Sequence, residues 1–193
     1  MTLVSDMRHR FAAEPAFTSR DVRAFFGRRR MSPGYQKLMV HKLISQGKLF
    51  RISKGAYTFM QEAQAVGFAF QPFYYGLQDA LSLRNLWEQE TVPVVVTPRR
   101  VRSGIRKFAG SNYLVRRIRR SMFFGFEMLR YGDFWIPVSD VEKTLIDLVY
   151  FRQPVSRGLA GELKRAIRKD VLKRYLKRSP LRVRKRVLAL LAE

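Results

Sequence analysis

The sequence predicts an α+β protein with an N-terminal winged helix-turn-helix, followed by a mixed α/β domain and a basic helical C-terminus. Three observations predict this fold class. Helical patterns lead into a short hairpin pattern within the first sixty residues, strand-like runs alternate with helical ones in the middle, and two amphipathic helical patterns end the chain. We therefore expect three segments, at residues 1–60, 66–151 and 152–193.

Two helices are expected before residue 28. The first covers about residues 5–13, where Met7 and Phe11 are four positions apart and share a face. The second begins after Thr18, a residue that caps helices, and Asp21 at the third position completes a capping box.

A third helix is expected from the Ser32-Pro33 pair to about residue 47, because serine caps and proline favours the first helical position. Its core-facing residues should be Tyr35, Leu38, Met39, Leu43 and Ile44. The opposite face should enter a DNA major groove and carries Gln36, Lys37, Val40, His41 and Lys42.

Two short alternating runs, at residues 49–52 and 56–59, flank a Ser-Lys-Gly turn and predict a β-hairpin. A hairpin directly after a helix-turn-helix is a wing, where Arg51 and Lys54 would contact phosphates or the minor groove. The candidate nucleic-acid-binding residues of this segment are Arg28, Arg29, Arg30, Ser32, Gln36, Lys37, His41, Lys42, Arg51 and Lys54. The alternative is a three-helix bundle with a β appendage that serves protein contacts only.

The charge of the chain favours a polyanionic partner. Lys and Arg number 38 against 15 Asp and Glu, for a net charge of +23. Residues 1–60 carry 12 basic and 3 acidic groups, residues 61–151 carry 12 and 9, and residues 152–193 carry 14 and 3. A generally charged surface of the thermophilic kind is the alternative, but it should raise Glu together with Lys and Arg.

Two basic helices are expected at the C-terminus, over residues 157–176 and 180–192, the second beginning at a Ser179-Pro180 pair. Its first turns carry the remaining nucleic-acid-binding candidates, Arg182, Arg184, Lys185 and Arg186. Backbone phosphates are the expected partner. A solvated face or a membrane surface are the alternatives.

Several classes of site are not expected. The chain has no cysteine and only two histidines, His9 and His41, so we expect neither a metal site nor a cofactor. No apolar run reaches the roughly 18 residues of a membrane helix, and the first residues lack the pattern of a secretory signal. We therefore expect a cytoplasmic protein with no membrane partner.

The middle segment predicts a helix over residues 75–86 and a buried strand over residues 92–97. Further strands are expected at residues 104–108, 113–118, 125–129 and 134–138. Ser139 should then cap a helix, with Glu142 as its capping-box partner.

Three parts of this segment resemble the AbiEi family of antitoxins: Tyr-Gly-Leu-Gln-Asp-Ala-Leu-Ser-Leu at 75–83, Val-Val-Val-Thr at 94–97, and residues 138–147 with Glu-Lys-Thr-Leu at 142–145. The resemblance covers most of residues 5–151. It implies a winged helix-turn-helix before an α/β antitoxin domain, in a regulator that represses its own operon. It also implies a functional link to a nucleotidyltransferase-like toxin without a stable complex. The basic C-terminus departs from the simplest version of this family.

Catalysis is not expected. The candidates for a metal-dependent nuclease are Asp79, Asp133, Asp140, Glu142, Lys143 and Asp147. Their spacing does not suit that chemistry, because Glu142 and Lys143 are adjacent rather than on one strand face. The expected function is therefore an operator-binding transcriptional regulator, acting as the antitoxin and autorepressor of a type IV toxin–antitoxin operon, and a homodimer is compatible with it. The alternative is an accessory protein that binds structured RNA, such as tRNA or a ribonucleoprotein.

Overall fold

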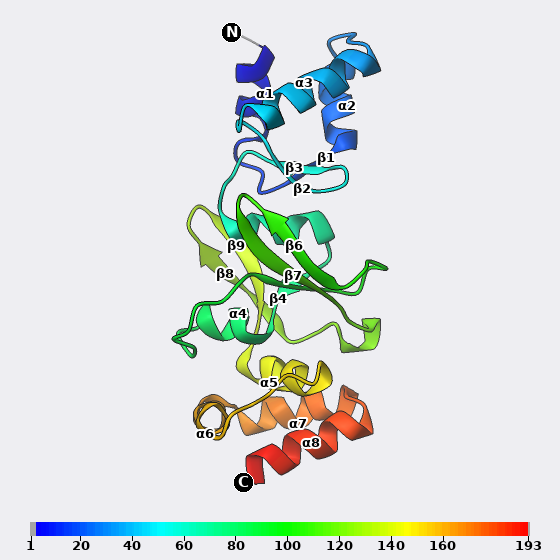
Figure 1. Ribbon diagram of the computed structural model, residues 1–193. Coiled ribbons are helices and arrows are strands. Elements are labelled where there is room, and N and C mark those ends of the chain that lie inside the picture. Colours follow the sequence, from blue (N-terminus) through cyan, green and yellow to red (C-terminus); the bar gives the residue numbers. More distant parts are fainter. Residues whose placement is uncertain (1–2, 193) are drawn as a thin grey trace. The chain divides into compact units, whose positions relative to one another are not determined.

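The computed structural model describes residues 3–192 and has a mixed α+β fold (Figure 1). The chain divides into two compact units. Unit 1 comprises Met1–Gln71 and Ile105–Tyr113, and unit 2 comprises Pro72–Gly104 and Leu114–Glu193. Within the described residues, no helix is both long enough and apolar enough to span a membrane.

The helices of unit 1 are α1 (Leu3–Phe11), α2 (Ser19–Gly27) and α3 (Pro33–Ser45). The two predicted N-caps are confirmed. Thr18 accepts a hydrogen bond from the backbone N–H of Asp21, whose carboxylate accepts from the backbone N–H of Thr18 at 2.7 Å. Ser32 accepts from the backbone N–H of Tyr35 at 3.3 Å, with Pro33 as the first helical residue. These local bonds satisfy amides that a helix start leaves without partners.

Unit 1 also contains a three-stranded antiparallel sheet, with the order β1 (Phe17–Thr18), β3 (Ala56–Thr58), β2 (Phe50–Ser53). Strand β1 lies between α1 and α2 in the chain, and the other two strands follow α3. The β2–β3 hairpin turns at Gly55, whose φ of 76° suits glycine. The carbonyl of Gly55 accepts the backbone N–H of Ser19 at 2.9 Å, so the turn lies against the start of α2. The core beneath these elements is formed by Met7, Phe11, Phe17, Val22, Phe25, Phe26, Val40, Leu43 and Leu49.

The larger sheet has six strands, in the order β6-β7-β5-β4-β9-β8. Their bounds are β4 (Tyr74–Tyr75), β5 (Val94–Thr97), β6 (Gly104–Phe108), β7 (Ser111–Arg117), β8 (Phe126–Tyr131) and β9 (Phe134–Ser139). The sheet is mixed, because β5 pairs with β7 and β4 with β9 in parallel while β4–β5 and β8–β9 are antiparallel. The predicted strands are confirmed to within about two residues at each end.

The helices of unit 2 are α4 (Leu77–Ser82), α5 (Val141–Tyr150), α6 (Arg157–Ala166), α7 (Lys169–Arg178) and α8 (Leu181–Ala192). The 3-10 helix η2 (Arg120–Met122) also belongs to unit 2, whereas the 3-10 helix η1 (Ala63–Phe70) belongs to unit 1. Helices α6, α7 and α8 pack around α5 (Figure 1). Residues on all four helices, among them Leu145, Leu163, Leu176 and Val187, belong to one buried core.

Two helix boundaries differ from the predictions. The expected helix over residues 157–176 is two helices, because Ile167 and Arg168 are extended and the backbone N–H of Arg168 donates to the Glu142 carboxylate at 2.6 Å. The helix expected over residues 75–86 is helical only at Leu77–Ser82.

The predicted cap of α5 was also wrong by one residue. Asp140, not Ser139, accepts the backbone N–H of Lys143 at 2.7 Å. The Ser139 hydroxyl instead bonds the hydroxyl of Thr144 at 2.7 Å. Glu142 is therefore no capping-box partner, and its carboxylate binds Arg168.

Candidate nucleic-acid interface

The outward face of α3 differs from the predicted one. Gln36 and Val40 are each only 8% exposed, whereas Leu38 is 62% exposed. With 3.6 residues per turn, Leu38 lies on the side of the helix opposite Gln36 and Val40. Lys37, His41 and Lys42 are exposed, as are Tyr35 and Ser32. The surface that α3 presents to solvent therefore combines an apolar Leu38 with basic and aromatic neighbours.

Gln36 is buried and makes a structural contact, and it also belongs to the lining of the groove described below. Its side-chain amide donates to the carbonyl of Met31 at 2.9 Å, just before α3 begins. Because a buried amide needs such partners, this bond fixes the segment that leads into α3. Gln36 therefore has a structural role in addition to its place in the groove.

A basic groove of about 620 Å³ lies between α2, α3 and the β2–β3 hairpin, all within unit 1. Arg23 from α2, Lys37 and His41 from α3, and Arg51 from β2 line it with polar groups. Apolar lining comes from Val22, Pro33, Val40, Ile44 and Tyr57. None of the described residues that line this groove is acidic. Its positive lining is suited to a phosphate backbone.

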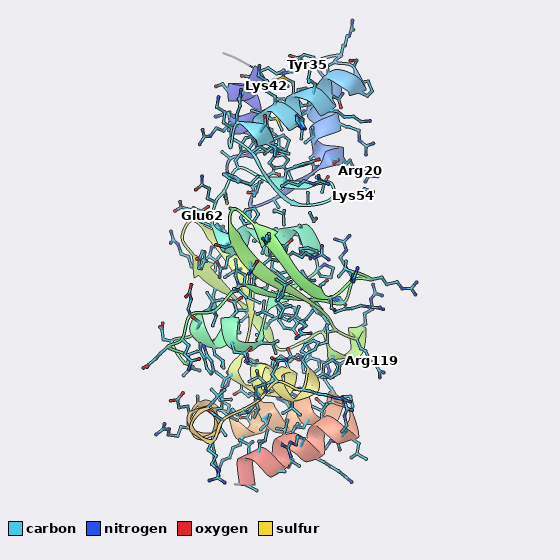
Figure 2. The ribbon with its side chains drawn as sticks, in the orientation of Figure 1. Arg20, Tyr35, Lys42, Lys54, Glu62 and Arg119 are labelled. Atoms are coloured by element: carbon cyan, nitrogen blue, oxygen red, sulfur yellow. The ribbon has the colours of Figure 1, made fainter. Side chains whose placement is uncertain are left out.

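The hairpin turn adds further basic groups beside the groove. Lys54 lies in the hairpin turn, next to Gly55. The carbonyl of Gly55 accepts the backbone N–H of Ser19, the first residue of α2, and Arg20 is the next residue of that helix. Figure 2 labels both side chains, together with Tyr35 and Lys42 on α3. Both Arg20 and Lys54 are exposed. These basic groups therefore come from two different elements of unit 1.

The three consecutive arginines before α3 have different surroundings. Arg29 stacks over the ring of Phe25 at 4.0 Å and pairs with the Asp6 carboxylate at 3.2 Å. Arg28 and Arg30 are exposed, and Arg30 adopts a φ of 56° where the chain turns toward α3. Arg29 thus contacts both α1 and α2, and all three arginines are exposed.

The C-terminal candidates lie on α8 in unit 2. Arg182, Lys185 and Arg186 are exposed. Arg184 is partly buried, and its guanidinium donates to the carbonyl of Leu176 at 3.1 Å and to that of Lys177 at 3.4 Å. Arg184 therefore satisfies carbonyls at the end of α7, a role distinct from contact with nucleic acid.

Comparison of the chain with protein-family models and with curated proteins gives no match. The assignment of a function therefore depends on the residues and geometry of the chain itself.

The acidic residues considered for catalysis are mostly buried and serve the fold. Asp79 accepts the backbone N–H of Val94 at 2.9 Å, and Asp140 accepts the Tyr175 hydroxyl at 2.8 Å. Lys143 and Asp147 form an ion pair with neither side chain exposed. Burial lowers the pKa of Lys143, and burial raises the pKa of Asp147. Over residues 3–192, no group of three or more His, Cys, Asp or Glu is placed to hold a metal ion.

Sequence reasoning missed Arg20 and Arg23 as interface candidates. Both lie on the polar side of α2, opposite the buried Val22, Phe25 and Phe26. The helical period of α2 could have identified them, because it separates these arginines from the apolar face.

Proposed function

We propose that unit 1 is a winged helix-turn-helix that binds double-stranded DNA, with α3 in the major groove and the β2–β3 hairpin as the wing. The observation that carries this proposal is the basic groove between α2, α3 and the hairpin, beside the exposed face of α3. Lys37, His41 and Lys42 would contact base edges or phosphates there, and Leu38 supplies an apolar surface suited to a thymine methyl group. Arg51 and Lys54 would contact the backbone.

We further propose that the protein is a transcriptional regulator of the AbiEi type, the antitoxin and autorepressor of a type IV toxin–antitoxin operon. This part rests on the resemblance of residues 75–83, 94–97 and 138–147 to that family. Residues 142–145 of the Glu-Lys-Thr-Leu motif are buried in α5, so a role in holding the domain together explains them. The expected toxin is a nucleotidyltransferase encoded next to this gene, and it would be countered without a stable complex.

A binding competition tests the DNA proposal against the alternative of structured RNA. DNA from upstream of the gene and total tRNA are offered together at near-physiological salt, with footprinting of the DNA. A protected operator that tRNA does not displace supports the regulator. Preferential tRNA binding with no footprint would refute it. The RNA alternative is favoured by one observation, the 14 basic residues against 3 acidic ones in residues 152–193.

Paired substitutions identify which residues read sequence. Lys37→Ala with Lys42→Ala should reduce the preference for operator over random DNA. Arg182→Ala with Lys185→Ala removes the same charge from exposed positions on α8 and should weaken both DNAs equally. Equal effects of the two pairs on preference would show that α3 is not the recognition helix.

The antitoxin role has its own test in cells. Expression of the neighbouring nucleotidyltransferase alone should arrest growth, and co-expression of this protein should restore it. Absence of such a gene, or no rescue, would remove the antitoxin proposal and leave DNA binding unaffected.

A further inference from the structure

A second arginine-rich pocket lies entirely within unit 2. It has a volume of about 560 Å³. Three of its arginines, Arg116, Arg117 and Arg119, come from β7 and the residues directly after it, and Arg182 comes from α8. The other lining residues are Ser103, Tyr150, Phe151, Pro180 and Val183. No acidic residue of the described chain lines this pocket.

The four arginines have no acidic partner in the described part of the chain, but the Arg116 guanidinium lies over the ring of Phe151, 5.9 Å from its centre. Among residues 3–192, none of them forms an ion pair with a carboxylate. Arg116 is partly buried, and its Nε is a buried donor that finds no hydrogen-bond partner in the described part of the chain. A buried charged donor without a partner is costly, so a bound acceptor would remove that cost.

The N-terminus of α8 adds amide donors to the same pocket. Pro180, directly before the helix, and Arg182 and Val183, in its first turn, line the pocket. The first amides of a helix have no carbonyl partner in that helix and favour an anion. The Ser179 hydroxyl donates backward to the carbonyl of Tyr175 at 3.0 Å. The predicted serine cap is therefore turned toward α7.

We propose that this pocket binds a phosphoryl group with two or more negative charges, as carried by a nucleoside polyphosphate or by the phosphorylated 5′ end of a nucleic acid. Four arginines and a helix N-terminus carry more positive charge than one phosphodiester, with its single negative charge, would neutralise. Tyr150 and Phe151 line the pocket with their rings packed edge to face, 5.0 Å between the ring centres, and Tyr150 offers aromatic surface for a base. The site does not depend on the proposed winged helix, because all of its residues belong to unit 2.

Calorimetry on the full chain with inorganic pyrophosphate tests the site. Wild type should bind pyrophosphate more tightly than sulfate at the same ionic strength. Arg119→Gln and Arg182→Gln change exposed side chains and should each weaken pyrophosphate binding by about tenfold. The matched control is Lys185→Gln, which removes one exposed charge from α8 outside the pocket and should change the affinity by less than about twofold.

Two results would overturn the proposal. One is wild-type protein that binds pyrophosphate no better than sulfate, which needs no variant to interpret. The other is a loss of pyrophosphate affinity in Lys185→Gln as large as the loss in Arg119→Gln, which would mean that the net charge of the protein alone attracts the ligand. Neither result bears on operator binding by unit 1, so failure here is distinguishable from failure of the regulator proposal.

Two further titrations distinguish a free nucleotide from a nucleic-acid end as the source of the phosphoryl group. If it is a free nucleotide, ATP should compete with pyrophosphate, and 5′-triphosphate and 5′-hydroxyl forms of one oligonucleotide should bind alike. If it is a nucleic-acid end, the 5′-triphosphate form should bind more tightly, and Arg119→Gln should abolish the difference. Identical binding of both oligonucleotides combined with no competition by ATP would also contradict the proposal.

Discussion

Lys143 and Asp147 form an ion pair one turn apart on α5, and neither side chain is exposed to solvent. The Tyr74 hydroxyl donates to the second oxygen of Asp147 at 2.7 Å, which links α5 to β4. Burial raises the pKa of Tyr74, and the neighbouring carboxylate of Asp147 raises it further. The Lys143 ammonium also lies 5.1 Å from the ring centre of Phe124. Each charge in this cluster is thus compensated inside the core of unit 2.

Substitution of Lys143 by Met should therefore destabilise the protein strongly. It leaves the Asp147 carboxylate buried without its cation, which costs about 3–5 kcal/mol in comparable buried pairs. Urea unfolding measures the loss. Lys173→Met, at an exposed position of α7, serves as the control and should change the unfolding free energy by less than about 0.5 kcal/mol. A loss in Lys143→Met as small as in the control would mean that the pair is not buried.

The contact between Glu142 and Arg168 predicts a dependence of stability on pH. Burial raises the pKa of Glu142, but hydrogen bonds from the guanidinium and backbone of Arg168 outweigh it, so the net pKa lies below the ordinary 4.5. A carboxyl whose pKa is lower in the folded state stabilises the fold above its unfolded pKa. That contribution is lost as pH falls through the folded value.

Urea unfolding of wild type and Arg168→Gln at pH 7 and at several values below pH 4.5 checks this. Arg168→Gln should be less stable at pH 7, and the difference from wild type should shrink as Glu142 is protonated. Arg174→Gln is the matched control, because Arg174 pairs with Asp170 at 3.9 Å on the exposed surface of α7. A difference that stays constant across this pH range would contradict the role given to Glu142.

The capping box at the start of α2 gives a third prediction. Hydrogen bonds from Thr18 lower the pKa of Asp21. Thr18→Ala should reduce the unfolding free energy by about 1–2 kcal/mol and raise the pKa of Asp21 toward its ordinary value. Thr18→Ser keeps the hydroxyl and should preserve both. NMR titration of the Asp21 carboxyl with urea unfolding measures the two effects, and an unchanged Asp21 pKa in Thr18→Ala would contradict the prediction.

The features that the sequence predicted well are local ones. The caps at Thr18 and Ser32 depend on residues within three positions, and hydrogen bonds over that distance leave a pattern that can be recognised. The hairpin turn at Gly55 is predictable for the same reason, because a positive φ requires a residue such as glycine.

The features that were not predicted from the sequence depend on contacts between residues that are far apart in the chain. The break between α6 and α7 is tied to Glu142, which is 26 positions away from Arg168. Ser139 and Asp140 are both good caps, and the choice between them depends on where the Thr144 and Tyr175 hydroxyls lie. The arginine pocket of unit 2 unites residues from β7 and α8, whose pairing no local pattern encodes.

The same limitation explains why the exposed face of α3 was predicted wrongly from the sequence. The observed face yields a fourth prediction. Both sides of this helix carry apolar residues, so periodicity alone placed Leu38 inside and Gln36 outside. Gln36→Ala should lower the unfolding free energy by about 1–3 kcal/mol, because it leaves the Met31 carbonyl without its donor. Leu38→Ala should leave stability within about 0.5 kcal/mol of wild type but reduce the preference for operator DNA. The reverse pattern would restore the face predicted from the sequence.

The salt dependence of DNA binding gives the last prediction. If about six to eight phosphates are neutralised, the slope of log K against log salt should be about −5 to −7, because each phosphate contact releases condensed counterions. Arg51→Gln removes one exposed cation of the basic groove and should make the slope shallower by about 0.9. Leu38→Ala should weaken operator binding at every salt concentration without changing the slope, since Leu38 carries no charge. Fluorescence anisotropy from 50 to 300 mM salt, on operator and random duplexes, measures these slopes. A wild-type slope near zero, or an Arg51→Gln slope equal to that of wild type, would mean that the groove does not contact phosphates.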